Sequence, residues 1–123
     1  MTANEISEKY IAYLEHGDVD SIIKLFTPNG IVDSPIYGIK KAEVFYNELK
    51  NDTSNSKLKL KGVFQNTNTN EFAIYFNYVW TLKNNEIVTF DVVDIIELNA
   101  ENKIKTLKII YDTVAARALV NKL

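Results

Sequence analysis

The sequence of 123 residues has no cysteine and one histidine. The absence of cysteine excludes disulfide bonds, a thiolate nucleophile and any cysteine-ligated metal. A single histidine, His16, cannot build a multi-histidine metal centre. His16 precedes Gly17 at a predicted helix end, where a cationic side chain suits the helix dipole, so we interpret it as structural. No metal site is expected.

Long apolar runs and an excess of basic residues are also missing. No stretch approaches the roughly 20 apolar residues that span a bilayer, and the polar segment 1–8 does not resemble a signal peptide. Fourteen Lys and Arg residues against sixteen Asp and Glu residues give a net charge of −2. This balance argues against a nucleic-acid-binding surface. We expect a cytoplasmic protein with neither a membrane nor a nucleic acid as partner.

The motifs of several large enzyme classes do not occur. There is no glycine-rich phosphate loop, no Walker pattern, no nucleophile elbow and no histidine-based triad. Most nucleotide-dependent and serine-hydrolase functions are therefore disfavoured, and no cofactor is expected. What remains is acid–base chemistry or ligand binding by tyrosine, aspartate and glutamate side chains.

The composition predicts a single globular domain over residues 1–123, because 46% of the residues are hydrophobic and 24% are charged. The first part predicts three helices. The first ends at Gly17, and the second begins after Asp18 as its N-cap. The third follows Gly38. Their apolar faces consist of Ile6, Tyr10, Tyr13 and Leu14, then Val19, Ile22, Ile23 and Phe26, then Ile39, Ala42, Phe45, Tyr46 and Leu49.

The remainder predicts strands. A turn at 28–30 precedes a short strand at 31–33 that Pro35 stops. After a polar loop at 51–56, alternating residues predict a half-exposed strand from 57 to about 64. Further strands are expected at 72–82, 87–98 and 104–111, and the tail at 113–123 is either a short helix or an extended edge. Helices followed by antiparallel strands indicate an α+β fold.

Asp94 is the residue that stands out, because it lies in the apolar stretch Val92–Ile96. Period-two alternation places it on one face with Phe90, Val92, Ile96 and Leu98. A carboxylate in such surroundings needs a partner, or else its pKa rises and it stays neutral. It is either a site residue, a structural hydrogen-bonding group or part of a dimer contact.

Two further pairs of candidate residues have weaker support from spacing alone. Tyr10 lies on the apolar side of the first helix, and Tyr46 lies similarly on the third, where a tyrosine is usually a core residue with a satisfied hydroxyl. Asp33 and Ser34 precede Pro35, and an acidic residue there is most often a turn cap.

These residues carry a resemblance to a known family. The stretch Lys9–Asp20, ending in Gly-Asp-Val-Asp, is followed by Leu25-Phe26 and by Val32-Asp33-Ser34-Pro35. With Val93–Asn99, this pattern resembles ketosteroid isomerases and their wider superfamily, the nuclear-transport-factor-2-like and polyketide-cyclase-like (SnoaL-like) proteins. The resemblance covers nearly the whole chain.

The resemblance implies a fold of three helices packed into the concave side of a strongly curved, mixed and mostly antiparallel sheet. This cone-shaped, cystatin-like architecture encloses a mostly apolar pocket. Such proteins are often homodimers through the outer face of the sheet, and strand 72–82 is apolar on both faces. The side chains expected to surround the pocket are Phe26, Ser34, Phe45, Tyr46, Phe76 and Trp80.

The resemblance also implies a chemistry. Tyr10 and Asp94 match the tyrosine and the protonated aspartic acid that form an oxyanion hole in the isomerases, and Tyr46 matches the tyrosine that supports the first one. The family's general base is the aspartate directly before the proline, where this chain has Ser34. Asp33 is one residue earlier, and an offset of one residue in extended chain turns a side chain to the opposite face. Asp33 is therefore only a candidate base.

Three functions remain open. The first is a carbon-acid isomerase or cyclase that acts on a small apolar carbonyl compound, with Tyr10, Asp94 and Asp33 as catalytic residues. The second is a non-catalytic module that binds an apolar small molecule in the same pocket, which the serine at position 34 favours. The third is a dimeric interaction domain whose interior is filled by large side chains.

Overall fold

The computed structural model describes residues 1–123 as an α+β fold of four helices and one six-stranded sheet. The elements in chain order are α1 (Ala3–His16), α2 (Val19–Lys24), β1 (Phe26–Ser34), β2 (Gly38–Lys41), α3 (Ala42–Asp52), β3 (Thr53–Gln65), β4 (Glu71–Leu82), β5 (Ile87–Leu98), β6 (Ile104–Ile110) and α4 (Val114–Val120). The predicted strands after residue 56 are confirmed, and the tail forms a short helix.

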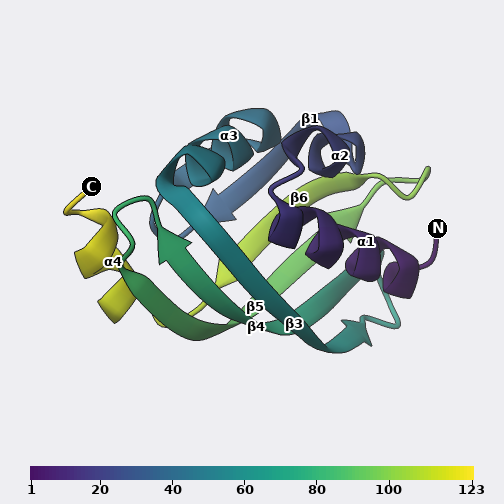
Figure 1. The fold of residues 1–123 in the computed structure, drawn as a ribbon. Helices are drawn as coiled ribbons and strands as arrows, with labels where there is room; N and C mark the ends of the chain where they lie inside the picture. Colours follow the sequence, from purple (N-terminus) through teal and green to yellow (C-terminus); the bar gives the residue numbers. More distant parts are fainter.

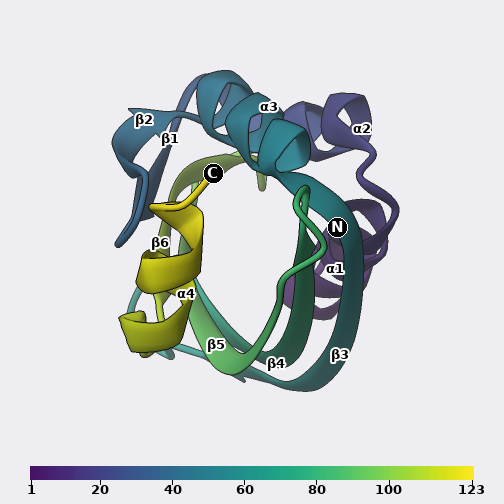
Figure 2. The ribbon, with the colours of Figure 1, turned by 60° about the vertical axis from the view of Figure 1, so that its left-hand side comes forward.

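The sheet is mixed and mostly antiparallel, with the strand order β2-β1-β6-β5-β4-β3. Only β1 and β6 pair in parallel, which joins the first part of the chain to the last strand. In Figure 2 the strands curve around the interior, α3 spans the open side of that curve, and α4 lies at one end. Figure 1 shows α1 crossing the sheet obliquely, and α1 contacts β3.

The helix boundaries follow from local sequence. Thr2 and Glu5 form a reciprocal capping box at the start of α1, and Gly17 ends the helix with a φ of 66°. Asp18 accepts a hydrogen bond from the Ser21 backbone N–H and so caps α2. The predicted end of the first helix at Gly17 and the predicted start of the second helix after Asp18 are therefore confirmed.

Four local predictions are wrong. Phe26 belongs to β1 rather than to the second helix, which already ends at Lys24. Residues 28–30 form no separate turn but an irregularity inside β1, where a Cβ on Gly30 would lie 2.7 Å from the Phe26 ring. The segment 51–56 is not a loop, because α3 runs to Asp52 and β3 starts at Thr53. Ile39 belongs to β2 rather than to the third helix and is 71% exposed.

The core lies between the helices and the inner face of the sheet. Side chains of α1, including Ile6 and Tyr10, join alternate residues of β4 and β5 in a single buried cluster. Burial alternates strictly along β4, with Phe76 and Trp80 inside. The interior therefore contains mainly large apolar side chains.

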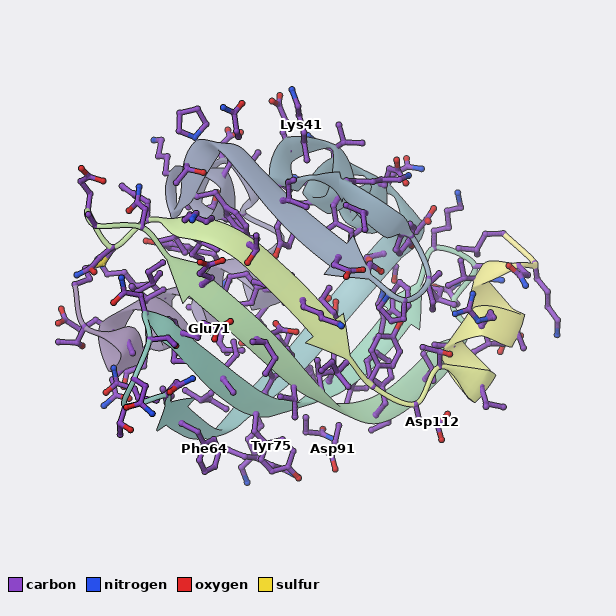
Figure 3. The ribbon with its side chains drawn as sticks, turned by 180° about the vertical axis from the view of Figure 1, so that it is seen from behind. Lys41, Phe64, Glu71, Tyr75, Asp91 and Asp112 are labelled. Atoms are coloured by element: carbon purple, nitrogen blue, oxygen red, sulfur yellow. The ribbon has the colours of Figure 1, made fainter.

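The outer face of the sheet carries a polar cluster. Asp91 accepts hydrogen bonds from Lys61 and Asn77, each at 3.2 Å, and Tyr75 lies beside them. These hydrogen bonds lower the pKa of Asp91. Figure 3 shows Phe64, Tyr75 and Asp91 projecting away from the sheet along one edge of the view. None of the four helices combines the length and hydropathy needed to cross a bilayer.

Candidate functional site

Asp94 lies at a small cavity between the helices and the inner face of the sheet, which we call the inner cavity. Twelve of its fourteen lining residues are hydrophobic, and they come from α1, α3, β4, β5, β6 and the segments around β1 and α4. The lining residues are Tyr10, Leu14, Ser34, Tyr37, Phe45, Leu49, Phe76, Tyr78, Trp80, Phe90, Val92, Asp94, Ile109 and Tyr111.

Asp94 is 1% exposed, and its Oδ1 atom has no hydrogen-bond partner. Its neighbours across the sheet are Ile74 on β4 and Ile109 on β6, neither of which has a polar side chain. Burial raises the pKa of Asp94 well above the ordinary value of 3.8. The carboxyl group is therefore protonated over an extended pH range, and its O–H can donate a hydrogen bond.

Tyr10 and Tyr46 form a buried pair, with their hydroxyl oxygens 2.6 Å apart. Burial raises the pKa of both tyrosines well above the usual range. Both hydroxyls are therefore neutral. When Tyr46 donates to Tyr10, the Tyr10 proton remains for a group in the cavity.

The segment before Pro35 separates two of the predicted residues. Ser34 is buried and lines the inner cavity, where its Oγ accepts the backbone N–H groups of Ile36 and Tyr37 at 3.3 and 3.1 Å. Asp33 is not among the lining residues, and its neighbours on β2 and β6 are Ile39 and Lys108. The one-residue offset thus places the candidate base away from Asp94 and Tyr10.

The structure brings most of the other predicted residues together. Phe45, Phe76 and Trp80 line the inner cavity, whereas Tyr46 lies behind Tyr10 and Phe26 packs against Tyr46 at a ring-centroid distance of 5.8 Å. Sequence reasoning missed Tyr37, Tyr78, Phe90 and Tyr111 as lining residues. Tyr78 and Phe90 share strand faces with Phe76 and Asp94, and Tyr111 follows Ile109 by two residues in the predicted strand 104–111, so alternation was a usable signal for all three. Tyr37 lies outside the regular elements and offered no such signal.

Several aromatic side chains direct their polar atoms to partners other than the cavity. Tyr37 donates to Asp52 at 2.7 Å, Trp80 Nε1 donates to Thr53 at 2.8 Å, and the Tyr78 hydroxyl lies 2.8 Å from Ser56 Oγ. Burial and the Asp52 carboxylate raise the pKa of Tyr37. Burial also raises the pKa of Tyr111 to about 12. No lining group other than Asp94 is a carboxyl, an amine or an imidazole.

The volume of the inner cavity is about 40 Å³. One water molecule occupies roughly 30 Å³ in the liquid, and ligand pockets usually measure about 300–1,000 Å³. The inner cavity therefore accommodates one functional group with its nearest substituents, and not a ring system. It offers hydrogen-bond donors to an oxygen atom within apolar walls. The structure contains no group of three or more His, Cys, Asp or Glu residues arranged to hold a metal ion.

No protein-family model matches the chain, and no curated protein is significantly similar in sequence. Solved structures do match. TerC, co-crystallized with polyporic acid, has a TM-score of 0.80 and 16% identity over 97% of this chain and 98% of TerC. A Catenulispora acidiphila protein with a ketosteroid isomerase-like fold, in complex with trimethylamine, has a TM-score of 0.78 and 12% identity over 90% of this chain and 88% of that one.

A third match is SalBIII, an epoxide hydrolase/cyclase-like enzyme with a role in pyran ring formation in the polyether salinomycin. Its TM-score is 0.77 and its identity is 19%, over 89% of this chain and 90% of SalBIII. The chain therefore has the fold shared by nuclear-transport-factor-2-like, ketosteroid isomerase-like and SnoaL-like proteins. At these identities the likeness establishes the fold alone.

Proposed function

We propose that this protein binds the carbonyl end of a small molecule in the inner cavity, with Tyr10 and Asp94 as hydrogen-bond donors to the carbonyl oxygen. The observation that carries this proposal is the buried Asp94 carboxyl, whose Oδ1 atom has no partner. Burying an unpaired polar group costs about 1–3 kcal/mol. A hydrogen bond between Asp94 and a ligand oxygen would offset that cost, whereas a core filled by apolar side chains would leave the carboxyl group unpaired.

Binding is preferred over catalysis because the inner cavity lacks a second acid–base group. Carbon-acid isomerisation needs a base near the substrate as well as donors to its oxygen. Asp33 is not in the lining, and Ser34 is occupied as a turn cap and is far too weak a base. The interaction-domain alternative is disfavoured because it leaves the buried Asp94 carboxyl without a role.

A carbon-acid isomerase or cyclase is the second candidate, and the Tyr10–Tyr46 pair beside neutral Asp94 favours it. Two neutral donors at one oxygen would stabilise an enolate, the species in which charge develops. The neighbours with similar folds add support for a small-molecule site. One of them is an epoxide hydrolase/cyclase-like enzyme, and two were solved with small molecules.

The test of binding uses acetone labelled with carbon-13 at the carbonyl, followed by NMR. We expect a downfield shift of the bound carbonyl signal, because hydrogen bonds polarise it. Asp94→Leu should abolish the shift, whereas Asp94→Asn should retain part of it since the amide still donates. A chemical shift identical in the wild-type protein and in Asp94→Leu would refute the proposed role of Asp94.

The test of catalysis follows hydrogen–deuterium exchange at the α-carbons of 2-butanone in deuterated buffer. An isomerase-like site should accelerate the exchange above the buffer rate, and Tyr10→Phe should reduce that acceleration by about tenfold or more. Binding without acceleration would remove the catalytic candidate and leave the binding function in place.

We also propose that two chains associate through the outer face of the sheet. Phe64 and Ile110 lie on that face and are 61% and 47% exposed. Phe64→Asp should convert a dimer into a monomer in sedimentation equilibrium. The control is Val44→Asp, because Val44 is also 47% exposed but lies on α3 and not on the sheet. A wild-type chain that sediments as a monomer at all concentrations would refute this association.

A further inference from the structure

A second and larger cavity lies beside the inner cavity, and we call it the outer pocket. Its volume is about 220 Å³. It is formed where the end of α1 and the start of α2 meet the last turn of α3 and the first residues of β3. Its polar lining includes Glu15, Lys50, Ser54 and Asn55, so it differs in character from the apolar inner cavity.

The two cavities share a wall made of side chains. Leu14, Leu49 and Tyr78 line both of them. Tyr46 lines the outer pocket, while its hydrogen-bonding partner Tyr10 lines the inner cavity. The two spaces are therefore separated by the thickness of single side chains.

The inner cavity is so small that a ligand bound in it needs additional space next to it. A volume of about 40 Å³ holds only the end of a ligand, so the rest of the molecule must extend beyond it. The inner cavity and the outer pocket together approach the lower limit of about 300 Å³ that is usual for ligand sites. Leu49 is half-buried in the last turn of α3, so its rotation is the simplest way to join the two spaces.

The free polar groups of the outer pocket favour an oxygen-rich, anionic group. Lys50 takes part in none of the four ion pairs of the structure, so its ammonium group is available. The Asn55 amide and the Ser54 hydroxyl can both donate hydrogen bonds. The Glu15 carboxylate already accepts the backbone N–H of Leu58 at 2.8 Å.

We infer that the inner cavity and the outer pocket form one site for an elongated keto acid. Its carbonyl group lies at Tyr10 and Asp94, its methylene chain passes Leu14 and Leu49, and its carboxylate lies near Lys50. This inference rests on the proposed function and extends it by naming the ligand class. It adds Lys50 as a residue that determines specificity.

The experiment compares three keto acids with methyl ketones of the same chain length. The acids are 4-oxopentanoate, 6-oxoheptanoate and 8-oxononanoate, and the ketones are 2-pentanone, 2-heptanone and 2-nonanone. Isothermal titration calorimetry gives each affinity. We expect one chain length at which the keto acid binds about five- to tenfold more tightly than its ketone, because a charge-assisted hydrogen bond forms only when the carboxylate reaches Lys50.

Two lysine variants identify the origin of the gain. Lys50→Gln should remove the advantage of the keto acid and leave the affinity of the ketone unchanged. Lys59→Gln is the matched control, because Lys59 is an exposed lysine on β3 outside both cavities. Both lysines are exposed, so neither substitution should affect folding.

Each outcome has a distinct meaning. Keto acids that bind no better than ketones at every length, or a gain that persists in Lys50→Gln, would overturn this inference while the proposed carbonyl site stands. Failure of every ketone and keto acid to bind would overturn the proposed function and the inference together. A gain confined to one chain length and lost only in Lys50→Gln would establish both.

Discussion

At the level of single residues, the protonation state of Asp94 depends on the side chains that surround it. Its neighbours across the sheet are isoleucines, and its Oδ1 atom has no partner, so the charged form is strongly disfavoured. Asp91, three residues earlier on the outer face, accepts hydrogen bonds from Lys61 and Asn77 and has a lowered pKa. Two aspartates on one strand thus have their pKa values shifted in opposite directions by the two faces of the sheet.

The stability of the protein should therefore depend on pH through Asp94. The folded chain holds this proton more tightly than the unfolded chain, so between the ordinary pKa of 3.8 and the raised pKa it binds more protons. Across that window the free energy of unfolding falls as pH rises, by up to about 1.4 kcal/mol per pH unit. Asp94→Asn should remove this loss and be increasingly more stable than the wild type toward neutral pH.

Urea unfolding of the wild type and of Asp94→Asn from about pH 4 to about pH 8 measures this difference in the free energy of unfolding. Asp91→Asn is the control with the opposite sign, because a lowered pKa in the folded state contributes stability that is present above the unfolded pKa and lost on acidification. Parallel curves for the wild type and Asp94→Asn would contradict a raised pKa of Asp94.

At the level of elements, the first two helices are delimited by their own sequence. The capping box at Thr2 and the left-handed Gly17 define α1, and Asp18 starts α2 directly afterwards. The end of α1 also contributes Glu15, His16 and Gly17 to the outer pocket. The turn at Gly17 thus sets the position of one wall of that pocket.

Gly17→Ala should lower the free energy of unfolding by about 1–2 kcal/mol, because a Cβ is strained at a φ of 66°. No atom lies within 4 Å of the position that this Cβ would take, so backbone strain is the only cost. Thermal and urea unfolding measure the loss. Gly17→Asn should lose less, since asparagine tolerates the left-handed region; equal losses for both variants would contradict this account.

At the level of the whole molecule, β6 joins the two halves of the chain. It pairs in parallel with β1 and antiparallel with β5, so the sheet would divide into two parts without it. Helix α4 follows β6 and is attached by the buried Ala116 and by a hydrogen bond from Arg117 to the Pro35 carbonyl at 2.6 Å. The two C-terminal elements therefore differ in their importance for folding.

Truncation should separate these contributions. A chain ending at Tyr111 loses α4 but keeps the complete sheet, so we expect cooperative unfolding at a lower urea concentration than the full chain requires. A chain ending at Lys103 also loses β6 and should not fold cooperatively. Circular dichroism during urea unfolding measures both, and a cooperative transition in the shorter chain would refute the central role of β6.

The sequence by itself determined the elements whose signals are local. The capping residues Gly17 and Asp18 and the apolar patterns of the strands expected at 72–82 and 87–98 predicted the boundaries of these elements correctly within a residue, because neighbouring residues decide them. Alternation along β5 placed Asp94 on one face with Val92 and Ile96, and the structure shows that this face is the inner one. The local signals failed at 28–30 and 51–56, where pairing with strands distant in the chain includes polar sequence in β1 and β3.

The candidate site depended on tertiary structure because it joins residues far apart in the chain. No local pattern brings the Tyr10 and Tyr46 hydroxyls together across 36 positions or adds Tyr37 to the lining of the inner cavity. The size of the inner cavity and its common wall with the outer pocket result from how the helices and the curved sheet pack their side chains. Periodicity predicts which side of an element is buried, whereas packing across elements decides what space is left.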